Sequence, residues 1–181
     1  MGAIDQNAEE IPIPDATAEP AAYVRALLAV LGRRDPLLVL SATPAEVDRI
    51  ITSSAAALER SPADGGWSFR DVLGHLLDVD IVYGFRIRLV LTADLPTYPG
   101  YDEKGFSSLP KLNANGLAGA FRWLRAANIE LLKTLTPVQM AREGVHSEQG
   151  RENVDLMVRK LAGHDLAHLQ QMQRAVEAAV S

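Results

Sequence analysis

The spacing of apolar residues along the chain is that of amphipathic helices. In four long stretches, apolar positions recur every three or four residues, which places them on one face of a helix. The helices predicted in this way cover residues 36–54, 68–93, 113–135 and 151–179. The same spacing before Gly32 predicts a further helix over 17–31. No segment sustains the period-two alternation of a half-buried strand, so we expect an all-α protein.

Helix-breaking and capping residues indicate where these helices begin and how they are joined. Ser68 followed by Asp71 has the spacing of a capping box, and it opens the helix predicted over 68–93. Pro44 lies inside an earlier predicted helix, and the sequence leaves open whether it breaks or only kinks that helix. Two long irregular connections are predicted, at 94–112 and 138–150. Connections of this length are usually functional or are ordered by packing.

The length of 181 residues fits one domain. Residues 1–16 are polar, contain two prolines and lack a period, so they are interpreted as a flexible lead-in. Residues 17–181 are predicted to form a single domain. Four long amphipathic helices with two substantial connections predict a four-helix bundle, here with an additional N-terminal helix.

Composition and charge exclude several classes of function. The chain has no cysteine, which removes disulfides, thiolate metal sites and a cysteine nucleophile. Its 18 Lys and Arg residues and 23 Asp and Glu residues give a net charge of −5 without a basic cluster, which disfavours a nucleic-acid partner. The longest apolar run is far shorter than the roughly 18 residues of a membrane span, and an acidic first segment does not fit a secretory signal. We therefore expect a cytoplasmic protein with a small-molecule substrate and no membrane partner.

Three of the four histidines lie on core-facing positions of predicted helices. His164 and His168 are four residues apart, so their rings project from the same helix face. His75 shares a helix face with valines at positions 72, 79 and 82 and also points inward. Each unsatisfied buried polar group costs roughly 1–3 kcal/mol, a cost that a shared divalent cation would remove. The competing interpretation is that these are hydrogen-bonded core histidines.

Two other metal templates fit the sequence poorly. His164 to His168 follows the zinc-protease pattern H-E-x-x-H only if Asp165 replaces the glutamate base, and no third ligand of that class follows. A di-iron carboxylate bundle needs two Glu-x-x-His turns on helices. Only Glu143 and His146 have that spacing, and they fall in an expected loop.

Two segments resemble the motifs of the DinB-like (DinB/YfiT) metalloproteins. Residues 67–80, WSFRDVLGHLLDVD, with the arginines at 86 and 88, resemble the second-helix signature of that family. Residues 162–171, AGHDLAHLQQ, resemble its last-helix motif, and residues 146–150 resemble the approach to that helix. The resemblance covers about residues 36–175. It implies a four-helix bundle in which His75, His164 and His168 bind one divalent metal ion, whereas the helix at 17–31 is a departure from the family pattern.

The resemblance implies a range of activities. Members include thiol-dependent S-transferases, a maleylpyruvate isomerase that uses mycothiol, the N-terminal part of ergothioneine-forming enzymes, a protein regarded as a hydrolase, and many without a known reaction. We therefore expect a metal-dependent enzyme of the thiol-dependent S-transferase or hydrolase type. Three imidazoles suit Zn, Ni, Fe or Mn. Because the chain has no cysteine, S-transfer would need a low-molecular-weight thiol as cosubstrate.

Several other residues are candidates for supporting roles. Asp71 and Asp165 could orient the imidazoles, although solvated helix-face carboxylates are the simpler interpretation. Arg86 lies on the His75 face of its helix and could hold an anionic substrate. Tyr101, with Tyr98 and Asp102 on the same long connection, could line the substrate pocket or form a lid. No catalytic residue beyond the metal ligands is assigned.

Two further interpretations stay open. The chain could be a noncatalytic bundle, stabilised by its metal, that acts in a stress response or as a dimeric binding module. Its histidines could also pair with Asp and Gln side chains without any metal. Three protein ligands beside an open coordination position would favour catalysis, whereas a fourth protein ligand would favour a structural site. A homodimer is expected.

Overall fold

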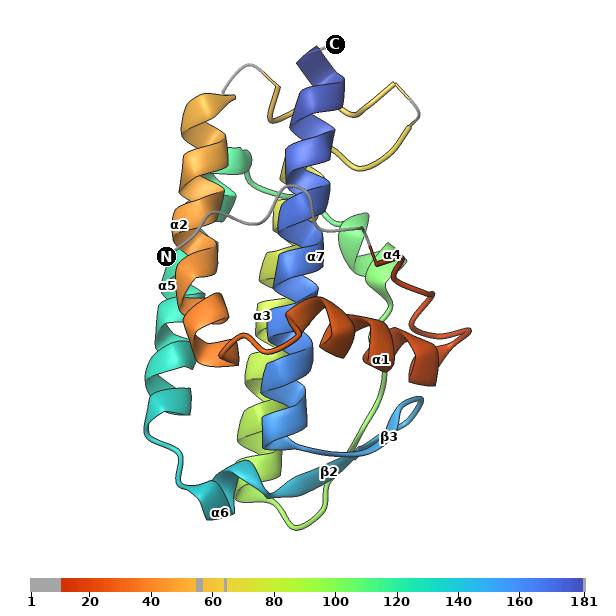
Figure 1. Cartoon of the computed structure of the whole chain (residues 1–181), viewed down its shortest axis with the longest axis vertical. Helices are drawn as coiled ribbons and strands as arrows, with labels where there is room; N and C mark the ends of the chain where they lie inside the picture. The colour runs from red at the N-terminus through yellow and green to blue at the C-terminus, as the bar shows by residue number, and fades with distance from the viewer. Residues whose placement is uncertain (1–10, 55–56, 64, 181) are drawn as a thin grey trace.

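Four long helices form the bundle seen in a computed structural model of the chain (Figure 1). The structure describes residues 11–54, 57–63 and 65–180. The bundle helices are α2 (Pro36–Ser53), α3 (Phe69–Thr92), α5 (Ala114–Lys133) and α7 (Val154–Val180). A further helix, α1 (Pro20–Leu31), precedes them. The prediction of an all-α four-helix bundle with an additional N-terminal helix is confirmed.

The bundle has two pairs of helices of opposite direction. Figure 1 shows α2 and α7 running one way and α3 and α5 running the other way. Because α3 and α5 are parallel neighbours, the chain must return along the bundle between them. This return segment contains the short strand β1 (Thr97–Tyr98) and the short helix α4 (Glu103–Ser107). It corresponds to the long connection predicted at 94–112.

Local sequence accounts for the helix ends. Ser68 caps α3, and its side chain and Asp71 exchange hydrogen bonds with each other's backbone N–H groups in the predicted capping box. The side chains of Asp35 and Asn113 cap α2 and α5 in the same way. The Asn153 side chain accepts a hydrogen bond of 2.8 Å from the Leu156 N–H at the start of α7. The inward faces of these helices form the core.

Pro44 neither breaks α2 nor leaves its backbone unsatisfied. A proline inside a helix cannot donate to the carbonyl four residues earlier, which here belongs to Leu40. The guanidinium of Arg125 on α5 donates to that carbonyl at 3.2 Å. The same group forms ion pairs with Asp80 on α3 and Asp165 on α7, and all three side chains are buried. Arg125 therefore links all four bundle helices.

A small sheet at one end of the bundle was not predicted. Strands β2 (Glu143–His146) and β3 (Gly150–Asn153) form an antiparallel hairpin, and β1 pairs with β2 in parallel. Gly150 has a φ of +78°, a left-handed conformation that suits the end of a three-residue hairpin loop. The strands have two to four residues, too few to give a detectable alternation. A short helix, α6 (Pro137–Met140), precedes the hairpin.

The N-terminal helix packs across α7 (Figure 1). Residues 1–10 of the predicted lead-in lie outside the described residues, and residues 11–15 have no regular secondary structure. Leu27 and Leu31 of α1 are buried. A β-carbon on Gly163 of α7 would lie only 2.1 Å from the carbonyl oxygen of Leu27, so glycine is what permits this approach. No helix in the described parts of the chain combines the length and apolar character needed to cross a membrane.

Candidate metal centre

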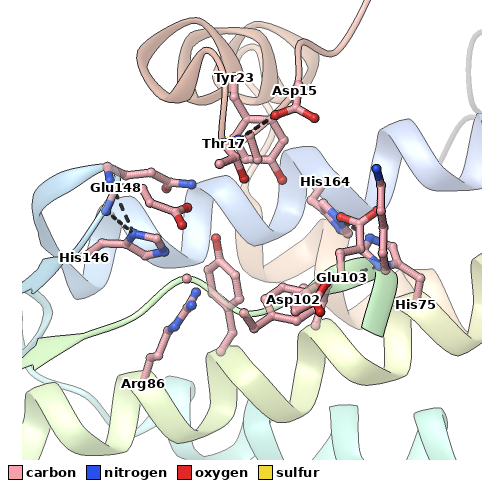
Figure 2. A pocket seen from close by; sticks show the side chains of 17 residues that line it. Asp15, Thr17, Tyr23, His75, Arg86, Asp102, Glu103, His146, Glu148 and His164 are labelled. Atoms are coloured by element: carbon pink, nitrogen blue, oxygen red, sulfur yellow. Dashed lines mark hydrogen bonds between the residues drawn. The ribbon is translucent and has the colours of Figure 1, made fainter. Parts of the chain in front are cut away.

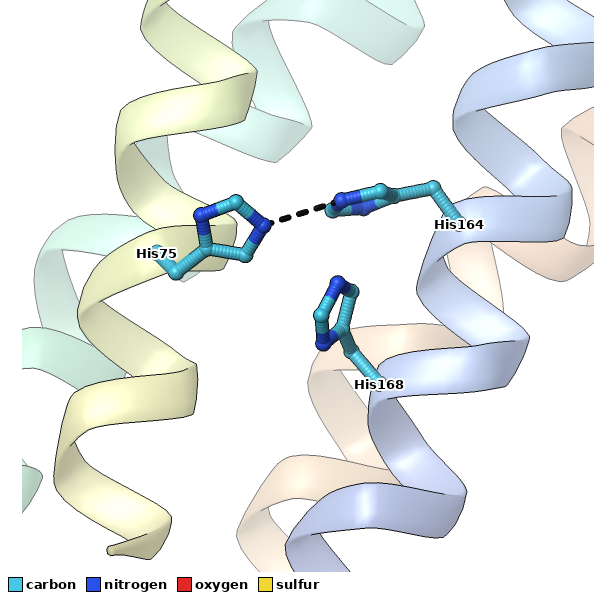
Figure 3. Close-up of side chains that lie close together, drawn as sticks. All are labelled: His75, His164 and His168. Carbon is cyan, nitrogen blue, oxygen red and sulfur yellow. Dashed lines mark hydrogen bonds between the residues drawn. The ribbon is translucent and has the colours of Figure 1, made fainter. Parts of the chain in front are cut away.

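The three core-facing histidines converge on one point between α3 and α7. His75 projects from α3, and His164 and His168 project from successive turns of α7 toward it, as Figure 3 shows. The Nε2 atoms of His75 and His164 are 3.0 Å apart. One ligand nitrogen from each of the three rings lies within 4.8 Å of the others. The structure thus brings together the three histidines that the sequence pattern assigned to one cluster.

The spacing of the nitrogens suits a metal ion. In tetrahedral coordination, two nitrogens at about 2.1 Å from zinc are about 3.4 Å apart. The Nε2 atoms of His75 and His164 are slightly closer than this, at 3.0 Å, and all distances between the three ligand nitrogens are within 4.8 Å, a limit above this value. Within the described residues, no fourth His, Cys, Asp or Glu side chain joins this cluster. The residues present therefore fit a divalent metal with at least one open coordination position.

Burial keeps the three imidazoles in the neutral form that metal binding requires. Burial, with smaller contributions from the neighbouring His168 and Lys111, lowers the pKa of His75 to about 3. Burial also lowers the pKa of His164 and of His168, although the hydrogen bond to Gln171 opposes the shift at His168. Neutral imidazole is the ligand form, so no proton has to be displaced near neutral pH.

Contacts to the other ring nitrogens orient two of the three rings. The Nδ1–H of His168 donates to Oε1 of Gln171 at 2.7 Å, which leaves Nε2 free to face the other histidines. The Tyr101 hydroxyl lies 3.4 Å from Nδ1 of His75. Nδ1 of His164 is the buried side-chain polar atom without a hydrogen-bond partner among the described residues. A metal ion on this ring would offset part of the cost of burying it.

His75 and His164 line the floor of a cavity of about 380 Å³ (Figure 2). One stripe of α3 forms this floor, with His75, Val79, Tyr83 and Arg86 at successive turns. The 11 residues from His75 to Arg86 correspond to about 16 Å along the helix and a net rotation of about 20°. The metal centre and Arg86 therefore occupy opposite ends of the same cavity. A second cavity of about 310 Å³ adjoins the triad from the side of His168 and Gln171.

Neither predicted supporting carboxylate contacts an imidazole. Asp71 binds Ser68 in the capping box and lies 3.9 Å from the Lys111 ammonium. Asp165 accepts hydrogen bonds from Arg125 and, at 2.7 Å, from the Thr43 hydroxyl. Asp165 follows His164 in sequence, so it points about 100° away around the helix and enters the bundle network instead. Among the described residues, neither of these two candidates forms the hydrogen bond to a histidine that a supporting role would require.

Both predicted pocket residues line the cavity. Arg86 is 6 % exposed, donates to the Pro99 carbonyl at 2.6 Å and lies against the ring of Tyr98. Tyr101 covers His75, and Asp102, also in the lining, caps α4. Tyr98 is not part of this lining; its hydroxyl donates to Glu152 at 2.9 Å.

Sequence reasoning missed lining residues that come from elements other than the two helices that carry the triad. His146 belongs to the unpredicted strand β2, and its Nδ1 accepts hydrogen bonds from the backbone N–H groups of Glu148 and Gln149 at 3.1 and 3.3 Å. Tyr23 reaches the cavity from α1, the helix that departs from the family pattern. The only local signal for His146 was its place in the motif preceding the last helix.

Comparison with known proteins identifies the family. The model of the DinB superfamily matches residues 39–172, which is most of the chain. The chain belongs to the DinB superfamily. This match includes α3 and the part of α7 up to Met172, and therefore all three clustered histidines, whereas α1 lies outside it.

Several DinB-superfamily relatives carry names that refer to a metal. YfiT from Bacillus subtilis (strain 168) is 28% identical over 144 residues, which cover 75% of this chain and 81% of YfiT. OB0782 from Oceanobacillus iheyensis is 30% identical over 127 residues, covering 66% of this chain and 71% of that protein. The solved structure of Bacillus subtilis YfiT has a TM-score of 0.68 and 26% identity, covering 77% of this chain and 84% of that one. Its title describes YfiT as a probable metal-dependent hydrolase with an unusual four-helix bundle topology.

Proposed function

We propose that this protein is a metal-dependent enzyme of the hydrolase type, with one divalent ion held by His75, His164 and His168. The observation that carries the proposal is the convergence of three neutral imidazoles, two of them buried and the third, His168, half-buried, beside a cavity that His75 and His164 line. The names of the DinB-superfamily relatives support the same class of activity. The lack of a fourth protein ligand in the described residues favours catalysis over a structural metal site.

The residues around the centre would each have a defined task. A bound divalent ion acts as a Lewis acid and lowers the pKa of a water molecule or thiol. Gln171 accepts a hydrogen bond from His168, and the Tyr101 hydroxyl lies beside Nδ1 of His75; these contacts direct the Nε2 atoms of both rings to one point. The long connection that carries Tyr101 restricts the access of water from one side. A cavity of about 380 Å³ is within the usual range for a small-molecule substrate.

Metal content is the first test. Elemental analysis of protein purified without an affinity tag should find about one divalent ion per chain in the wild type. His164→Ala and His168→Ala should lose it, whereas the matched control His146→Gln, which changes a histidine outside the triad, should retain it. A wild type with no more metal than His164→Ala would refute the proposal.

Activity then separates the hydrolase type from the S-transferase type. The metal-loaded protein is assayed against ester and amide substrates, and against electrophiles with and without low-molecular-weight thiols. Hydrolysis that needs no thiol and stops on chelation supports the hydrolase proposal. Turnover that requires an added thiol identifies a transferase instead, and turnover that survives chelation excludes a metal-dependent mechanism of either type.

A further inference from the structure

We infer that the end of the cavity opposite the triad is a carboxylate-binding subsite formed by Arg86 and His146, so that the substrate is a small molecule with a free carboxylate. This inference rests on the proposed function for its metal-bound reaction centre, but the binding it describes needs no metal. It concerns the end of the cavity farthest along α3 from His75, where Figure 2 shows both side chains.

The charge of Arg86 is not neutralised by the protein. The described residues contain three deeply buried cations, at Arg86, Arg125 and Lys160. Arg125 is paired with two aspartates and Lys160 with Glu152. No carboxylate in the described part of the chain lies within ion-pair distance, 4.0 Å, of Arg86, which has one backbone acceptor and the faces of two tyrosine rings. Buried charges are normally paired, so an unpaired one that lines a cavity indicates an anionic ligand.

The hydrogen-bonding state of His146 suits the same ligand. Two backbone N–H groups donate to its Nδ1, so the ring proton is on Nε2. Burial and the nearby Arg86 lower the pKa of this ring to about 4, which keeps it neutral at pH 7. Among the described residues the ring forms hydrogen bonds only through Nδ1, so Nε2–H has no acceptor there, and the ring lines the cavity. His146 therefore offers a donor, and no acceptor, at the position next to the guanidinium.

The rest of the lining makes a single carboxylate more suitable than a multiply charged anion. Four acidic residues also line the cavity, namely Asp15, Asp102, Glu103 and Glu148. Burial raises the pKa of Glu103, and the proximity of Asp15 raises it further. A second negative charge on the ligand would meet these carboxylates. The guanidinium of Arg86 binds one carboxylate well because its N–H groups match the geometry of two oxygens.

A matched pair of probes tests the subsite without a substrate or a metal. Hexanoate and hexanamide have the same length and differ in charge, and their binding to chelator-treated protein is measured by ligand-observed NMR. We expect hexanoate to bind the wild type at least about tenfold more tightly. Arg86→Gln should abolish this preference, and His146→Gln should reduce it severalfold. Lys104→Gln, which removes an exposed cation from the same lining, should leave it unchanged.

Several results would overturn the inference. The subsite is excluded if hexanoate fails to bind the wild type or binds it no better than hexanamide. It is also excluded if Arg86→Gln keeps the preference for hexanoate, or if Lys104→Gln loses it. If Arg86→Gln does not fold, Arg86→Lys takes its place, because lysine keeps the charge but cannot donate two parallel hydrogen bonds to a carboxylate. This variant should show a severalfold smaller preference for hexanoate over hexanamide. An undiminished preference would contradict the inference. Because the assay contains no metal, an inactive metal centre would leave its outcome unchanged.

Discussion

Substitution of Gly163 by alanine tests how α1 is held on the bundle. The added β-carbon would lie 2.1 Å from the carbonyl oxygen of Leu27 and 2.7 Å from its carbon, both of which are backbone atoms. Ordinary C···O contacts are about 3.3 Å or longer, so α1 would have to move by about 1 Å. Overpacking of this kind costs about 1–3 kcal/mol, against about 0.5–1 kcal/mol that alanine gains over glycine inside a helix. Because the obstructing atoms are backbone, the cost should fall in the upper part of its range, about 2–3 kcal/mol, which leaves a net loss of about 1–2.5 kcal/mol.

Urea unfolding followed by circular dichroism measures this loss, and Gly119→Ala on α5 provides the control. A β-carbon on Gly119 meets no atom within 4 Å, so this variant should gain about 0.5–1 kcal/mol from helix propensity alone. The metal content of Gly163→Ala should match that of the wild type because α1 supplies no ligand. If Gly163→Ala is as stable as Gly119→Ala, the close contact between α1 and α7 is not present in solution.

Two further substitutions probe buried ionisable side chains. Arg125→Met should lower the free energy of unfolding by about 3–5 kcal/mol, because it leaves Asp80 and Asp165 buried without a cation; a loss below about 1 kcal/mol in urea unfolding would contradict this role. The pKa of His146 is about 4 in the fold and about 6.5 in the unfolded chain. Between these pH values the unfolded state binds a proton that the folded state does not. The free energy of unfolding therefore falls as the pH falls from about 6.5 toward 4. The decrease in unfolding free energy between pH 7 and pH 5 should be about 1–2 kcal/mol smaller in His146→Gln than in the wild type, and equal decreases would show that the ring is not held neutral.

Local periodicity was enough to predict the long helices and the histidine cluster. A separation of four residues places His164 and His168 on one face of α7 whatever the rest of the fold does. The valines around His75 similarly fix the inward face of α3. Two such faces in one bundle both turn toward its core, which made a shared site a hypothesis; the meeting of the three rings at one height along the bundle is shown by the structure.

Features that depend on distant parts of the chain could not be predicted in this way. Pro44 leaves the Leu40 carbonyl without its helical donor, and this carbonyl accepts a hydrogen bond from Arg125, which belongs to another helix. A signal for this residue existed, because Arg125 follows Phe121 by four positions and precedes Asn128 by three, within the buried stripe of α5. The partners of that charge, Asp80 and Asp165, were not deducible from spacing. The short strands likewise depend on pairing between segments far apart in the sequence.

The cavity combines a centre on two bundle helices with walls that come largely from other segments. The triad lies on α3 and α7, within the segment that matches the DinB superfamily. Much of the wall comes from elsewhere: Asp15 and Tyr23 precede the matched segment, and Tyr101 and His146 lie on the connections between helices. Connections vary more than the helices they join, and they carry much of the specificity of binding sites. Relatives that share the three histidines therefore need not share a substrate, and the substrate of this chain has to be sought from its own cavity lining.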